Sequence, residues 1–143
     1  MRSSNQKGSA AIELAISFSV LWLAFTGVFQ FGYSTFLYNG LVGQVANAAR
    51  YSSRADFDST DTNRFVTTVK NVAVYGNPEG TGKPLNPMLD AAHVRVSWQA
   101  DAAGVPRTIQ VDVVNLHVNA IFRSFRFDSR PGVTVRYAGK YIS

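Results

Sequence analysis

Residues 9–38 read SAAIELAISFSVLWLAFTGVFQFGYSTFLY, and this stretch decides the fold of the 143-residue chain. After Glu13 it runs for 25 residues, from Leu14 to Tyr38, without a charged side chain. The hydrocarbon core of a bilayer is about 30 Å thick, a distance that roughly 20 apolar residues cross as a helix. Because every backbone polar group in lipid must be satisfied within the chain, a spanning segment has to be helical. The stretch therefore predicts a membrane-spanning helix.

The charges on either side of this stretch predict its orientation. Residues 1–8 carry Arg2 and Lys7 and no acid, whereas the first positive charge on the far side is Arg50. Positive residues favour the cytoplasmic side of a membrane. We therefore expect the N-terminus to stay in the cytoplasm and the rest of the chain to be exported.

A cleaved secretory signal is the competing interpretation, and it would release a soluble domain. It needs an apolar core of about 7 to 15 residues followed closely by a small-x-small cleavage site. The small residues of Ala46-Asn47-Ala48 lie too far along the chain for that. A buried helix of a soluble protein is also disfavoured, because no polar face appears between Leu14 and Phe29.

The helix is expected to continue beyond the membrane. Apolar residues recur there at helical spacing, at Leu37, Leu41, Val45 and Ala48 or Ala49. Polar residues are expected elsewhere around the helix, at Asn39, Gln44, Asn47 and Arg50. Gly40 and Gly43 weaken or bend this part, each costing about 1 kcal/mol relative to Ala. A continuous helix from about Ser9 to Ser53 would be on the order of 65 Å long.

Glu13 has two interpretations. An ionised carboxylate in hydrocarbon costs at least about 2.5 kcal/mol, so it needs either water or a partner. In the first interpretation Glu13 is hydrated at the cytoplasmic interface and Leu14 begins the span. In the second, a cut after Gly8 gives Ser9 a new α-ammonium group four residues before Glu13, on the same helix face. The amine of an incoming subunit would then neutralise Glu13 of a seated subunit and set the axial register.

The order of residues in this region resembles a known family. A short basic leader ends in Gly8, and the small residues Ser9-Ala10-Ala11 lead into Ile12-Glu13-Leu14-Ala15. Two later blocks complete the pattern, Gly27–Tyr33 (GVFQFGY) and Asn47–Tyr51 (NAARY). In this order and spacing, the region resembles the N-terminus of type IV pilin-like precursors. It is most similar to the TadE-like proteins of the tight-adherence (Tad) pilus system.

Three residues depart from the family pattern. Leu14 stands where the family usually has Phe, and Gln30 where an acid is common. Ser9 stands where major type IV pilins favour an aromatic residue, although Ser is acceptable in Tad-type pseudopilins. The first two departures indicate a divergent member.

The resemblance implies a minor pilin or pseudopilin in the biogenesis of the Tad (Flp) pilus, a system of adhesion and secretion. It implies a prepilin peptidase that recognises Gly8 and releases a subunit starting at Ser9. The helix would pack against other pilin-like subunits through residues such as Leu14, Phe18, Leu21 and Phe25. The implied partners are these subunits, the Tad assembly proteins, the peptidase and the bacterial inner membrane. The alternative is an uncleaved single-pass protein presenting a periplasmic binding domain.

The chain thus divides into a leader (1–8), a transmembrane and amphipathic helix (9–54) and an exported domain (55–143). Within the last, residues 55–62 are polar and predict a linker, and Thr60 or Asp61 is placed to cap a second helix. The expected core face of that helix is Phe65, Val66, Val69, Val72 and Ala73. The Gly- and Pro-rich residues 75–87 predict a loop.

Alternating apolar residues predict a small antiparallel sheet after this loop. Strands are expected at 93–99, 107–118 and 133–137, the first two joined as a hairpin. The alternation shifts by one residue at Val113-Val114, which indicates a bulge or a strand end. The apolar residues 120–127 either cover a sheet edge or form an exposed patch, with packing favoured. The fold class is therefore α+β, a long pilin-type helix followed by a small antiparallel sheet with one packing helix.

No pattern indicates an enzyme or a cofactor site. The chain has no cysteine, and its charge of +5 is spread out, which disfavours nucleic-acid binding. His93 and His117 are the two histidines, both expected to point outward from strands without a metal-ligand cluster around them. Asp56, Asp58 and Asp61 lack the glycine and terminal Glu of a calcium loop.

Overall fold

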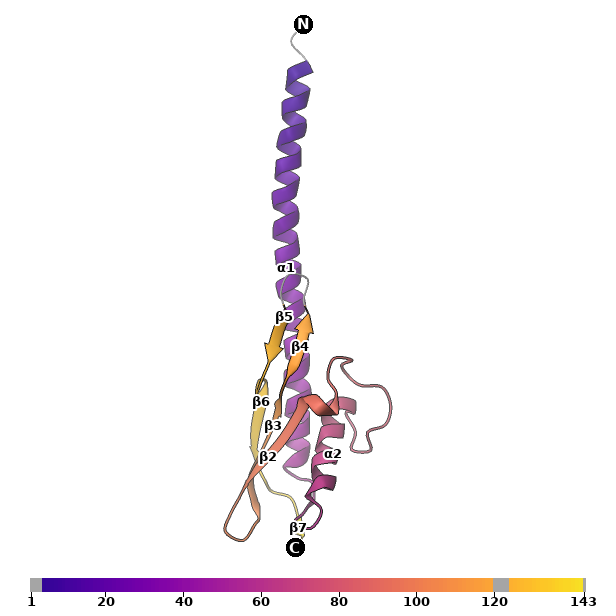
Figure 1. Ribbon diagram of the computed structural model, residues 1–143, viewed down its shortest axis with the longest axis vertical. Helices are drawn as coiled ribbons and strands as arrows, with labels where there is room; N and C mark the ends of the chain where they lie inside the picture. Colours follow the sequence, from indigo (N-terminus) through magenta and orange to yellow (C-terminus); the bar gives the residue numbers. More distant parts are fainter. Residues whose placement is uncertain (1–3, 120–123, 143) are drawn as a thin grey trace. The chain divides into compact units, whose positions relative to one another are not determined.

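The computed structural model describes residues 4–119 and 124–142, with side chains described for residues 8–118 and 124–142. Arg2, and Ala120 to Arg123 of the predicted apolar segment, lie outside the described residues. The chain forms two compact units, Met1–Phe36 and Leu37–Ser143. Helix α1 runs without interruption from Ser4 to Ser52, so Gly40 and Gly43 do not end it. The fold is α+β, as predicted (Figure 1).

The second unit, Leu37–Ser143, is called the head below. One face of α1 belongs to its core. Leu41, Val45, Ala48 and Ala49 are at most 1% exposed, which confirms the predicted apolar spacing. Gln44 is also buried, so its predicted place on the polar side is wrong. It stands three residues after Leu41 and one before Val45, and so occupies the same face of the helix.

Helix α2, Thr62–Tyr75, has a cap at each end. The carboxylate of Asp61 accepts a hydrogen bond from the backbone N–H of Arg64 at 3.1 Å, as the sequence predicted. Gly76 ends the helix in the left-handed conformation, with φ of 78°. The buried face comprises Phe65, Val69, Val72, Ala73 and Val74. Val66, which the sequence analysis assigned to the core, is only partly buried. Val74, which it left out, is buried instead.

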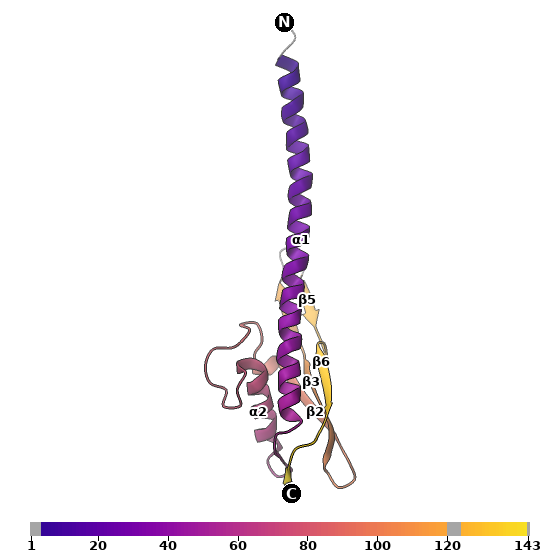
Figure 2. The same cartoon turned by 180° about the vertical axis from the view of Figure 1, so that it is seen from behind.

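The main sheet has three antiparallel strands in the order β2-β3-β6: Val94–Ala100, Pro106–Val113 and Gly132–Arg136. Its core face pairs Trp98 with Ile109 and Ile109 with Val135. The C-terminal part of α1 and α2 both contribute to the hydrophobic core that this face completes (Figures 1 and 2). The hairpin predicted between the first two strands is confirmed.

The predicted shift of alternation marks a strand end. Strand β3 stops at Val113, and Asn115 turns the chain with a positive φ of 52°. Strand β4, Leu116–Asn119, then pairs with β5, Ser124–Phe127, in a separate two-stranded sheet. The single strand expected over 107–118 is therefore two strands. In β5, Phe127 is partly buried and stacks on Tyr38 with ring centroids 6.0 Å apart.

The predicted linker over 55–62 contains a core residue that the sequence analysis missed. Phe57 is 2% exposed and lies in β1, Phe57–Asp58, which pairs in parallel with β7, Tyr141–Ile142. Its ring contacts Phe65 at 5.1 Å and Trp98 at 5.3 Å between centroids, both edge to face. Phe57 therefore joins α2, the sheet and the C-terminal strand.

Tyr137 fastens the C-terminal segment to the end of α1. Its hydroxyl lies 2.7 Å from the carbonyl oxygen of Lys140 and 3.0 Å from that of Ala55, and it accepts the Phe57 N–H at 3.1 Å. Burial raises the pKa of the Tyr137 phenol, so it remains a donor at neutral pH. A Cβ at Gly139 would come within 2.4 Å of the Ala55 carbonyl, which explains the glycine there.

Replacing Phe57 with Ala should lower the free energy of unfolding of the head by about 3–5 kcal/mol, because it empties the ring cluster at the centre of the core. Urea unfolding of the full-length chain in detergent micelles measures this through Trp98 emission in a Trp22→Phe background. The matched control is Leu85→Ala, since Leu85 is 58% exposed; its effect should stay within about 0.5 kcal/mol. Equal losses in the two variants would contradict the assignment of Phe57 to the core.

Candidate assembly surface

The N-terminal unit exposes an apolar helix surface. The residues predicted to pack against other helices are Leu14, Phe18, Leu21 and Phe25, and all are between 60 and 71% exposed. Their spacing of four, three and four residues places them on one face of α1. The most apolar 18 residues of this helix have a mean hydropathy of 1.9, and 0% of them are buried within the subunit. The surface is therefore available to lipid or to another helix.

Two hydroxyls of this unit are hydrogen-bonded within the helix, as suits a medium without water. Ser19 donates its hydroxyl to the Ala15 carbonyl at 2.8 Å, and Thr26 donates to Trp22 at 2.8 Å. These hydroxyls thus need no external partner. Trp22 is flanked by Phe18 and Phe25, with ring centroids 6.1 and 6.2 Å away. The result is a continuous aromatic surface along this side of the helix.

The predicted processing and register residues lie at the start of the same helix. Gly8, Ser9 and Glu13 are all exposed. A Cβ at Gly8 would meet nothing within 4 Å, so the fold itself does not require a glycine there. Ser9 and Glu13 are four residues apart within α1 and so share a face, as the sequence analysis expected. In the uncut chain the Ser9 nitrogen is a peptide nitrogen and carries no charge.

Residues 8–50 match the family model described as TadE-like protein. The N-terminal helix is TadE-like. This TadE-like match begins at Gly8 and takes in the candidate assembly residues and the first part of the head. The match covers about a third of the chain, and the TadE-like family is a structural, pilus-associated one. Together with the apolar helix, it indicates a membrane protein. Neither a curated protein nor a solved structure matches the chain significantly.

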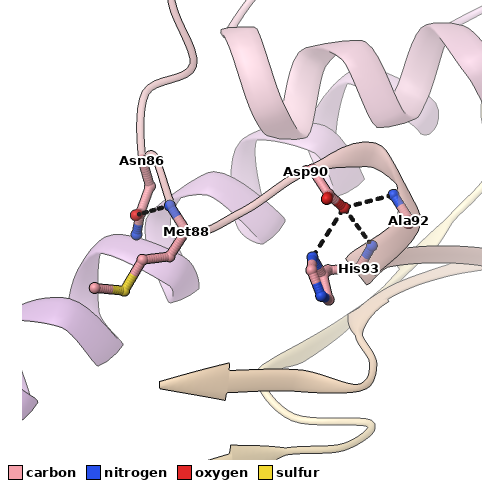
Figure 3. Close-up of polar contacts among 5 residues, drawn as sticks. All are labelled: Asn86, Met88, Asp90, Ala92 and His93. Carbon is pink, nitrogen blue, oxygen red and sulfur yellow. Dashed lines mark hydrogen bonds and ion pairs between the residues drawn. The ribbon is translucent and has the colours of Figure 1, made fainter. Parts of the chain in front are cut away.

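The head beyond the TadE-like segment holds the remaining polar candidates. His93 lies in the short helix η1, Ala91–His93, rather than in a strand, and is partly buried. Its Nδ1 is 2.8 Å from the Asp90 carboxylate, which also accepts the N–H groups of Ala92 and His93 (Figure 3). Asp90 therefore caps η1 and lies close to the imidazole ring. His117 is exposed, as predicted.

Two of the three acids of the predicted loop, Asp58 and Asp61, have structural partners. Asp58 accepts hydrogen bonds from the backbone and the hydroxyl of Thr60, which lower the pKa of its carboxyl, and Asp61 caps α2. They line a cavity of about 570 Å³ together with Asp56 and Glu79. Sequence spacing gave no sign of this cavity, because Glu79 joins it from the loop that follows α2. Over the described residues, no group of three or more His, Cys, Asp or Glu is arranged for a metal ion.

The two tryptophans provide a test of where the membrane surface lies. In vesicles containing brominated lipids, the emission of Trp22 should be strongly quenched because its ring projects from the apolar helix. Trp98 packs against Phe57 and Phe65 in the head and should be quenched little. Single-tryptophan variants, Trp98→Phe and Trp22→Phe, separate the two signals. Equal quenching in both would contradict the assignment of the span to the N-terminal unit.

Proposed function

We propose that this protein is a minor pilin or pseudopilin of the Tad pilus, which joins or assists the filament by packing its N-terminal helix against those of other subunits. The observation that carries this proposal is the unpartnered apolar face of a helix whose sequence is TadE-like. A helix of this kind is stable only in lipid or among other helices. The same face therefore serves storage in the membrane and contact with other pilin-like subunits.

The proposed topology follows from the charges around the helix. The protein spans the bacterial inner membrane once, with Lys7 on the cytoplasmic side and the head in the periplasm. Prepilin peptidase cuts after Gly8 and leaves a mature subunit that starts at Ser9. Tad assembly proteins then receive the subunit. The head accompanies it to the outside if it enters the filament.

The pairing of Ser9 and Glu13 is proposed to set the register between subunits. The new amine of one subunit and the carboxylate of its neighbour neutralise each other in a surrounding of low polarity. There, an unpaired charge is far more costly than at a wet surface. The axial position that pairs them is therefore favoured over neighbouring positions on an otherwise apolar helix.

A Gly8→Ala variant should fold and insert normally but keep its first eight residues. A Cβ at this position meets no atom of the subunit, so a loss of processing would come from recognition by the peptidase. The intact mass of protein extracted from membranes of a host with a Tad peptidase measures the outcome. Ser4→Ala is the matched control and should be processed like the wild type. A full-length mass for the wild type would favour the uncleaved anchor instead.

Replacing Glu13 with Ala should leave membrane insertion intact and reduce assembly several-fold, because the Ser9 amine of the neighbour loses its partner. The ratio of the protein in the sheared-filament fraction to that in the membrane fraction measures this. Glu13→Asp keeps the charge and should retain most of the assembly. If Glu13→Ala assembles like the wild type, the proposed register pair is wrong.

A further inference from the structure

A groove of about 320 Å³ opens on the head beside the first turn of α1 in the second unit. One side is formed by Tyr38 and Val42 of α1, and the other by the residues that lead into β6. Ser129 and Arg130 supply polar groups, and Val133 supplies an apolar surface. All of these residues belong to the second unit. The groove therefore combines a cation with apolar walls.

Arg130 is the uncompensated charge in this groove. It is exposed, and within the described part of the chain it has no ion pair or hydrogen bond. Neither neighbouring acid pairs with it within the described residues: Asp112 is fully buried and paired with Arg95, and Asp128 forms no ion pair with Arg130. The groove thus presents one unpaired guanidinium.

Side chains of the main sheet hold the loop that carries Arg130 in place. Arg95 bridges the buried carboxylate of Asp112 and the hydroxyl of Ser129, the latter at 2.9 Å. A buried carboxylate keeps its partner strongly, because an unpaired charge there is costly. Gly132 lies against Asp112, where an added Cβ would come within 3.1 Å of the Asp112 Cβ. These contacts with the sheet therefore fix the loop that places Arg130 at the groove beside Tyr38.

The groove begins where the exposed apolar surface of the helix ends. Phe36, which is 73% exposed, is the last residue of the first unit, and Tyr38 follows two residues later. Val42 lies about one helical turn, or roughly 6 Å, beyond Tyr38. The polar layer of a bilayer extends about 5–8 Å beyond the hydrocarbon core on each side. Tyrosine is also enriched at this boundary. A chain that spans the membrane through Leu14 to Phe36 holds the groove at the depth of the lipid headgroups.

We propose that the groove binds the headgroup of an anionic phospholipid in the periplasmic leaflet. Arg130 contacts the phosphate through its planar donors, and Val42 and Val133 contact the glycerol end of the lipid. A second copy of the chain is a less suitable occupant, because it would have to bring an acid to the site. The proposal rests on the membrane-held state of the proposed function, though not on leader cleavage or on filament entry.

Native mass spectrometry of the full-length chain, released from nanodiscs of equal phosphatidylglycerol and phosphatidylcholine, tests this inference. The wild type should retain phosphatidylglycerol in preference. Arg130→Gln should lower that preference about five-fold, the effect of one basic residue at an anionic surface. Arg130→Lys keeps the charge and should keep most of the preference. Arg136→Gln, the matched control, removes the same charge at the other end of β6 and should change nothing.

Several results would overturn the proposal. An unchanged preference in Arg130→Gln would do so, and so would equal losses in the Arg130 and Arg136 variants, which would indicate diffuse attraction. An Arg130-dependent phosphate adduct from phosphatidylcholine discs with inorganic phosphate would indicate a site for free anions. Lipid retention that appears only in dimers would indicate a second copy at the groove. The chain is tested with and without residues 1–8. Lipid binding can therefore be judged even if the pilin hypothesis fails.

Discussion

The apolar face of the first unit has to be removed from water, and this requirement governs the other properties of the protein. Burial of Leu14, Phe18, Leu21 and Phe25 gains about 25 cal/mol for each Å² that leaves water. The subunit itself leaves each of these side chains 60–71% exposed, and so most of this surface uncovered. Only lipid or other helices can cover it. The internal hydrogen bonds of Ser19 and Thr26 show the same adaptation in the polar residues of the helix. Anchoring and assembly are therefore alternative ways to bury one surface.

The sequence was sufficient where the structural signal is local. A helical period predicted the buried face of α1 at Leu41 and Val45, and a period of two predicted that Trp98 and Ile109 face the core. Phe57 escaped because its strand pairs with Tyr141, near the opposite end of the chain. A lone aromatic residue among polar neighbours carries no periodic signal. The burial of Asp112 could not be predicted for a related reason, since it depends on Arg95 and a distant loop.

The candidate site likewise has one part that sequence spacing predicts and one part that it does not. The common face of Ser9 and Glu13 follows from a spacing of four residues and could be read directly from the sequence. The groove could not, because it brings Tyr38 of the long helix together with Arg130 near the C-terminus. Contacts between subunits are a further step away from sequence spacing. They depend on the shape of two surfaces, of which one chain supplies only half.

The helix and the head cannot be separated at the small residues near Ala48, and this bears on the secreted alternative. Cleavage there would remove Leu41 and Val45, which are at most 1% exposed, from the core of the head. Each fully buried side chain of this size contributes about 1.5–3 kcal/mol. The net stability of a domain is only about 5–15 kcal/mol. A released domain would therefore lose a large part of its stability together with one wall of its core, so the structure favours a mature protein that keeps α1 attached.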